Sequence, residues 1–125
     1  MHLLFDTQPL LLWLSAPESL SPAAHDAIRD ESNLVYVSAA SVWEIAIKRS
    51  LGKLAAPDNL TQLLVENEFL ELPVTAVHAL GVERLPPVHR DPFDRLLASQ
   101  AAHEGLTLVT RDIELLKYPV PLLAA

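Results

Sequence analysis

The chain has 125 residues, of which 50% are hydrophobic and 20% are charged, so it can build the core of one compact domain and is not disordered by composition. It has no cysteine, which excludes disulfide bonds and thiolate metal sites. The net charge of −7 argues against holding nucleic acid by bulk electrostatics, so such binding would have to be local or mediated by metal ions, and the same charge suits a basic partner protein.

The N-terminal segment does not read as a signal peptide, because it has no basic region and Asp6 interrupts its apolar run. The longest apolar run, residues 10–14, is far too short to cross a bilayer. We therefore expect a cytoplasmic protein that does not associate with membranes.

Proline, serine and aspartate mark the starts of the expected helices, and glycine marks some of their ends. Pro9 begins an apolar helix, Ser21 precedes a proline at the first helical position, and Ser41 can cap a third helix with Glu44 at the capping-box position. The expected helices cover residues 9–14, 22 to about 32, 41–51, 60–68, 75–84 and 92–103, with a short helical turn opened by Asp112.

Short, continuous apolar runs predict the strands, which cover residues 3–5, 34–37, 69–73, 106–109 and 120–123. Strands of this kind are buried on both faces by helices, which is typical of parallel sheets. The alternation of strands and helices therefore predicts an α/β fold, a three-layer α/β/α sandwich with a short, mostly parallel central sheet, in a single domain over residues 1–125.

Acidic residues from four segments are expected at one edge of this sheet, because ligands of open parallel sheets sit beyond the carboxyl ends of the strands. Asp6 follows the first strand, Glu44 lies in the first turn of the helix after the second strand, and Asp112 follows the strand at 106–109. Asp91 and Asp94 bracket the start of the helix at 92–103. Carboxylates are the ligands that hard cations such as Mg²⁺ and Mn²⁺ prefer, and such a cluster can hold one or two ions.

Each acid also has a purely structural interpretation. Asp6 could end a strand by bonding a loop, Glu44 could be the capping-box partner of Ser41, and Asp91 and Asp112 could be helix caps. Asp94 suits the positive end of its helix. The functional interpretation rests on several acids meeting at one edge of the sheet.

Other residue types give weaker signals. The histidines, at positions 2, 25, 78, 89 and 103, show no metal-ligand spacing, and we interpret them as surface or structural groups. Trp13 and Trp43 lie in helical apolar patterns typical of core or interface positions. Three arginines near the acids could pair with carboxylates or contact phosphates, and the sequence leaves both open: Arg90, Arg95 and Arg111.

Four stretches together resemble the PIN-domain family, and specifically its VapC-type toxins. They are LFDT at 4–7, SAASVWEIAIK at 38–48, HRDPFDRLL at 89–97 and GLTLVTRD at 105–112. They occur in the family's order and reach both ends of the chain. The resemblance implies a PIN-like fold over the full length.

The resemblance also implies an endoribonuclease that depends on Mg²⁺ or Mn²⁺ and hydrolyses RNA by in-line attack of metal-activated water. The family's catalytic and metal-binding acids map onto Asp6, Glu44, Asp94 and Asp112. Accessory roles fall to Asp91 and Thr110, and contacts with RNA phosphates to Arg95 and Arg111.

The implied partners are a second copy of the chain, in a homodimer, and a cognate antitoxin protein that covers the active site. One position departs from many relatives, which have His or Asn after the Asp-Thr pair where this chain has Gln8. The alternative to an enzyme is a non-catalytic PIN-like module that binds RNA or protein, and the presence of all four family acids argues against it. A haloacid-dehalogenase phosphatase would need an acid where Gln8 stands, and a receiver domain would need paired early acids.

Overall fold

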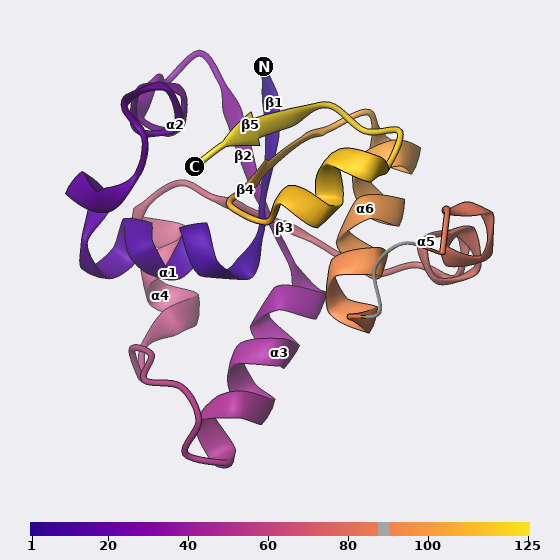
Figure 1. Ribbon diagram of the computed structural model, residues 1–125. Helices are drawn as coiled ribbons and strands as arrows, with labels where there is room; N and C mark the ends of the chain where they lie inside the picture. Colours follow the sequence, from indigo (N-terminus) through magenta and orange to yellow (C-terminus); the bar gives the residue numbers. More distant parts are fainter. Residues whose placement is uncertain (88–90) are drawn as a thin grey trace.

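Strands and helices alternate along the chain in the computed structural model (Figure 1). The structure describes residues 1–87 and 91–125, so the interpretations of His89 and Arg90 lie outside the described residues. The strands are β1 (His2–Phe5), β2 (Leu34–Ser38), β3 (Leu70–Leu72), β4 (Thr107–Thr110) and β5 (Leu122–Ala124). The helices are α1 (Thr7–Ser15), α2 (Pro22–Arg29), α3 (Ala39–Ser50), α4 (Leu60–Glu66), α5 (Ala76–Gly81) and α6 (Pro92–Glu104), with 3₁₀ turns η1 (Pro17–Ser19), η2 (Val82–Arg84) and η3 (Ile113–Lys117).

The strands form one parallel sheet in the order β3-β2-β1-β4-β5. β1 lies at its centre, where Leu4 is in register with Tyr36 of β2 on one side and with Leu108 of β4 on the other. The chain moves outward from β1 in one direction and later returns to its other side. The carboxyl ends of β1 and β4 therefore form the point where the strand order reverses, which is where open α/β sheets bind ligands.

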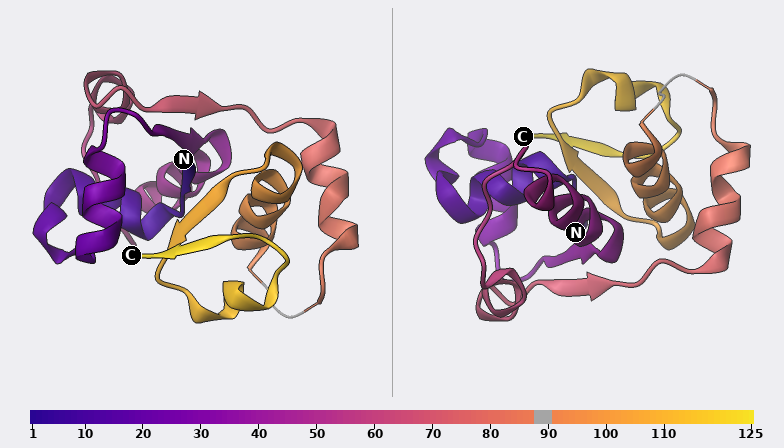
Figure 2. Two further views of the ribbon diagram at one scale, coloured as in Figure 1. Left: turned by 90° about the horizontal axis from the view of Figure 1, so that it is seen from above. Right: turned by 90° about the horizontal axis from the view of Figure 1, so that it is seen from below.

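Helices cover both faces of the sheet, and the alternation of side chains in β1 serves both layers. Leu3 and Phe5 belong to a core that includes α1, α2 and α4, whereas Leu4 belongs to a second core built mainly with α6. Figure 2 shows α1 and α2 on one side of the sheet and α6, with α5 outside it, on the other. The predicted three-layer α/β/α sandwich with a parallel sheet is confirmed.

Side-chain caps fix several helix starts where the sequence predicts them. Ser21 accepts from the backbone N–H of Ala24, Thr75 from that of His78, and Asp112 from that of Glu114. At the other end of α6, Gly105 has a φ of 68°, a left-handed conformation that glycine adopts without strain. No helix in the described part of the chain has the length and apolar character needed to span a membrane.

Two predicted helix starts are wrong, and both errors change where the site residues lie within their helices. α1 begins at Thr7 rather than Pro9, because Asp6 itself caps the helix and a proline in the first turn has no N–H to lose. α3 begins at Ala39, capped by Ser38 rather than by Ser41. Glu44 therefore lies in the second turn of α3 and is not a capping-box residue.

Some boundaries also differ from the prediction by a few residues. α2 ends at Arg29, before the expected end near Ser32, because the Asp30 carboxylate accepts from the backbone N–H and hydroxyl of Ser32 and forms a local turn. α4 ends at Glu66, and Glu68 takes a positive φ of 59° before β3. The helix expected to reach residue 84 becomes a 3₁₀ turn after Gly81, and β5 starts at Leu122 rather than at residue 120.

Candidate active site

Asp6 is held at the carboxyl ends of the two central strands. Its backbone N–H donates to the Val109 carbonyl of β4 at 2.9 Å. Its carboxylate accepts from two groups, the Thr7 N–H at 2.8 Å and the Thr110 hydroxyl at 2.8 Å. Asp6 is only 8% exposed. It does not bond a loop, as its structural interpretation proposed, but caps α1, and it also places a carboxylate at the point where the strand order reverses.

Glu44 extends from α3 toward Asp6, and both of its carboxylate oxygens accept hydrogen bonds. The Thr7 hydroxyl donates to Oε1 at 2.6 Å, and Lys48 Nζ donates to Oε2 at 2.7 Å. The Glu44 side chain is 7% exposed and that of Lys48 is 45% exposed, so the ammonium brings charge from the surface to a buried acid. Thr7 follows Asp6 directly, and it therefore links the first turn of α1 to α3.

The remaining acids come from the start of α6 and the end of β4. Asp91 caps α6 by accepting from the Phe93 and Asp94 N–H groups at 2.9 and 3.4 Å, as predicted. Asp112 is tied to Thr110, whose Oγ1 accepts from the Asp112 N–H at 3.0 Å. A cleft of about 420 Å³ is lined by all five acids that the sequence singled out: Asp6, Glu44, Asp91, Asp94 and Asp112.

Burial makes a negative charge on Asp6 unfavourable, and the carboxylates around this cleft add to the effect. Burial raises the pKa of Asp6 above its ordinary value of 3.8, hydrogen bonds from Thr110 and Thr7 oppose this, and the charges of Glu44 and Asp112 raise it further. The hydrogen bond to Glu44 raises the pKa of Lys48. A cation in the cleft would offset this repulsion, and the donor set, which consists of carboxylates and a threonine hydroxyl, fits a hard divalent ion such as Mg²⁺ or Mn²⁺.

The two arginines assigned to phosphates differ in position. Arg111 lines the cleft, and it donates to the carbonyls of Ala125, at 3.0 Å, and Ser19. Arg95 is not brought to the cleft lining, and its guanidinium donates to the carbonyls of Pro86 and Val82 at 3.0 and 2.9 Å. For Arg95 the geometry favours a structural role, and contact with RNA stays a prediction for both.

Thr7 and Lys48 contact the site but were not singled out in the sequence. Lys48 follows Glu44 by four residues, a spacing that places two side chains on the same face of a helix and could have identified the pair. Nothing local indicates that Thr7 would bond a glutamate 37 residues away. Gln8 also lines the cleft, next to the acids.

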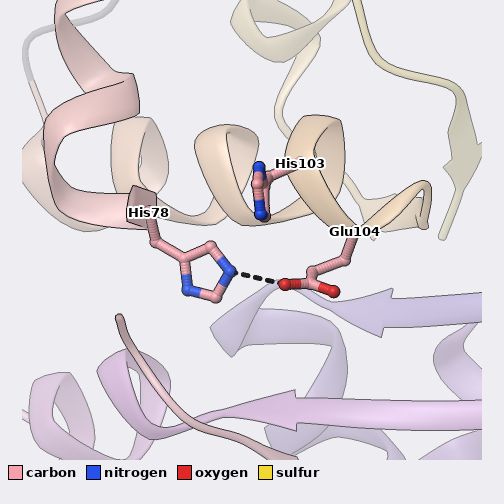
Figure 3. Close-up of side chains that lie close together, drawn as sticks. All are labelled: His78, His103 and Glu104. Carbon is pink, nitrogen blue, oxygen red and sulfur yellow. Dashed lines mark hydrogen bonds and ion pairs between the residues drawn. The ribbon is translucent and has the colours of Figure 1, made fainter. Parts of the chain in front are cut away.

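A second group of potential ligands lies on the far side of α6 and consists of His78, His103 and Glu104 (Figure 3). Their donor atoms lie within 4.8 Å of one another, but His78 Nδ1 accepts from the Thr75 N–H at 3.1 Å. This leaves the proton on Nε2, which donates to Glu104 Oε1 at 2.8 Å. A metal on Nε2 would require the opposite tautomer, so the group fits a helix cap and a contact between helices better than a metal site.

The architecture places a cleft lined by carboxylates at the carboxyl edge of a parallel sheet, where open α/β sheets bind ligands. A family model described as PIN domain matches residues 3–121. The chain therefore belongs to the PIN-domain family, whose members are generally hydrolytic nucleases. A comparison with curated protein sequences gives no match.

Solved structures of toxin–antitoxin and VapBC assemblies contain similar chains. VapBC2 from Rickettsia felis, bound to a DNA fragment from their promoter, matches with 18% identity over 98% of each chain and a TM-score of 0.73. VapBC from Salmonella typhimurium, bound to DNA, matches with 14% identity over 98% of this chain and 97% of that one, with a TM-score of 0.67. A toxin–antitoxin complex from Klebsiella pneumoniae matches with 16% identity over 97% and 95% and a TM-score of 0.64. At these identities the likeness establishes the fold.

Proposed function

We propose that this chain, as one PIN-like domain over its full length, is an endoribonuclease dependent on Mg²⁺ or Mn²⁺ and the toxin of a toxin–antitoxin pair. The observation that carries the proposal is the meeting of five carboxylates in one cleft at the carboxyl ends of β1 and β4. Acidic groups repel one another, and a fold that gathers them around a buried aspartate is best explained by a bound cation.

The residues that would hold the ion are Asp6, Glu44, Asp94 and Asp112. A divalent ion bound there supplies positive charge to the scissile phosphate and lowers the pKa of water. Thr110 helps to orient two of these residues, Asp6 and Asp112, because its hydroxyl donates to the Asp6 carboxylate and accepts from the Asp112 N–H. Asp91 fixes the first turn of α6 and so positions Asp94.

The cationic side chains of the cleft limit the repulsion of an anionic substrate. Lys48 and Arg111 both line the cleft, and each can attract a phosphate oxygen. Gln8, also in the lining, can hydrogen-bond a phosphate or a ribose hydroxyl, but it cannot take up a proton near neutral pH. These contacts would be local, as the net charge of −7 requires.

The partner assignment follows from the assemblies that contain similar chains. A cognate antitoxin that covers the cleft would present basic residues, since the surface it meets is acidic. We also propose a homodimer that acts in the cytoplasm, in keeping with the VapC-type resemblance.

Cleavage of total cellular RNA tests the proposal. Antitoxin-free protein with Mn²⁺ should give discrete products, and these should disappear with EDTA and with the folded Asp94→Asn variant. Glu114→Gln is a matched control, because Glu114 is an acid two residues from Asp112 that does not line the cleft. Absence of cleavage by folded, metal-loaded protein would favour a non-catalytic module that binds RNA or protein.

A further inference from the structure

Trp43 projects from α3 into solvent beside the acidic cleft. The residue is 61% exposed, which is unusual for the largest apolar residue and excludes the core position among the core and interface positions expected from the sequence. The other tryptophan, Trp13, differs, because it is partly buried against the core, packs on His25 and donates from Nε1 to Asn67 Oδ1. Trp43 therefore has exposed indole surface that the fold itself does not use.

Phe93 holds the exposed indole in place. The two rings pack edge to face, with centroids 5.4 Å apart and an interplanar angle of 65°. Such pairs are stabilising beyond the area they bury, and this contact restricts the motion of the Trp43 side chain. An immobilised aromatic ring loses less conformational entropy when a second ring stacks on it.

Trp43 and Phe93 do not line the cleft, but each is next in sequence to an acid that does. Trp43 precedes Glu44 in α3, and Phe93 lies between Asp91 and Asp94 at the start of α6. Because these three acids line the cleft, the aromatic pair lies at the place where α3 and α6 approach each other next to the acids.

We propose that Trp43, oriented by Phe93, stacks on an unpaired base of single-stranded RNA next to the phosphate held in the cleft. This inference rests on the proposed nuclease function and assigns the contact with that base to one residue outside the acidic cleft. Proteins that hold single-stranded nucleic acid combine positively charged grooves with aromatic side chains on which the bases stack. A chain with a net charge of −7 gains little from the first of these contributions, which gives a stacking contact more weight.

The surroundings of Trp43 favour one base over a protein partner. Protein partners generally cover contiguous apolar patches. The neighbours of Trp43 on its face of α3 are the buried Ala40, the exposed but small Ala46 and the partly buried Ile47, which add little apolar surface. The other large apolar side chain that is strongly exposed next to α3, Leu51, lies at the opposite end of the helix. A single exposed ring matches the size of a single base.

Fluorescence of Trp43 in a Trp13→Phe protein provides the test, with a random-sequence RNA octamer as the probe and stopped-flow mixing to record binding before cleavage. The octamer should quench Trp43, and an octamer of abasic ribose phosphates should not. Trp43→Ala should weaken octamer binding by about tenfold, whereas Trp43→Phe retains most of it and Leu51→Ala leaves it unchanged.

The outcomes separate the two proposals. If Trp43→Ala binds and cuts the octamer as the wild type does, stacking is wrong and the nuclease stands. If the variant keeps its RNA binding but sediments as a smaller species, the ring belongs to an interface between copies and stacking is again wrong. Quenching and weakened binding without any cleavage by wild-type protein would support stacking and overturn the nuclease. Failure of the wild type to bind RNA would overturn both.

Discussion

Thr7 Oγ1 lies 2.6 Å from Glu44 Oε1 and donates a hydrogen bond to it, while the Thr7 N–H donates to Asp6 Oδ1 at 2.8 Å. One residue thus orients two acids that come from different elements of the fold. Because both acids are buried, their positions depend on donors supplied by the protein as much as on any bound ion.

Removal of the Thr7 hydroxyl should destabilise the protein and misplace Glu44. In Thr7→Val the buried Glu44 Oε1 loses its donor, and we expect the free energy of unfolding to fall by about 1–3 kcal/mol in urea titrations. RNA cleavage should fall as well. Thr7→Ser keeps the hydroxyl and should retain most of both properties. Equal stability and activity of Thr7→Val and the wild type would show that this bond does not hold Glu44.

The raised pKa of Asp6 predicts how the stability of the metal-free protein depends on pH. The folded state holds the Asp6 proton more tightly than the unfolded state, whose pKa lies near 3.8, so this group lowers stability as pH rises above 3.8 through the folded-state pKa. In EDTA, the free energy of unfolding of Asp6→Asn relative to wild type should therefore increase between pH 3.5 and pH 7. Asp26→Asn, at a side chain that is 84% exposed, is the matched control. A difference that does not change with pH would contradict this assignment.

A bound divalent metal ion should offset the loss of stability that the ionised Asp6 carboxylate causes in the wild type. A ligand that binds only the native state stabilises it by about 2.7 kcal/mol at about 100 times its Kd. We expect added Mn²⁺ to raise the Tm of the wild type measured by calorimetry, with little change for Asp6→Asn. Glu104→Gln, which alters the group with His78, should respond as the wild type does. Loss of the response in Glu104→Gln alone would move the metal site to the far side of α6.

Lys48 should compete with the metal ion for Glu44. Its ammonium donates to Glu44 Oε2 at 2.7 Å and places positive charge in the cleft. Lys48→Met removes both the hydrogen bond to Glu44 and the positive charge. Because partly exposed ion pairs contribute modestly to binding energies, Mn²⁺ affinity should rise only about two- to fivefold in titration calorimetry. The exposed Lys53→Met change should leave the affinity unaltered. Weaker Mn²⁺ binding by Lys48→Met would mean that Lys48 positions Glu44 for the ion.

The sheet and the acid cluster could be predicted from the sequence because both depend on local patterns. Residues 3–5, for example, are apolar at every position, as is typical of strands buried on both faces. The acids that follow β1 and β4 meet because the carboxyl ends of parallel strands share one edge. That geometry places Asp6 and Asp112 together without any information on distant contacts.

Several of the details that were wrong or missed depend on contacts between distant residues. Ser38 and Ser41 both have the sequence features of a cap, and Ser38 takes the role at the end of β2, where its hydroxyl donates to Gln100, 62 residues away. Ser41 instead lies inside α3, with a buried hydroxyl that has no hydrogen-bond partner among the described residues. The exposure of Trp43 likewise follows from how α3 packs against α6, which sequence periodicity does not encode.

The most direct test of the central claim is anomalous scattering from a crystal of the protein grown with Mn²⁺. The proposed site predicts an anomalous peak in the cleft, within coordination distance of carboxylate oxygens of Asp6 and Asp112. An Asp6→Asn crystal should lose that peak. A Mn²⁺ peak found only beside His78 and Glu104, or no peak in the cleft at a saturating concentration of Mn²⁺, would contradict the claim that these acids form a metal centre.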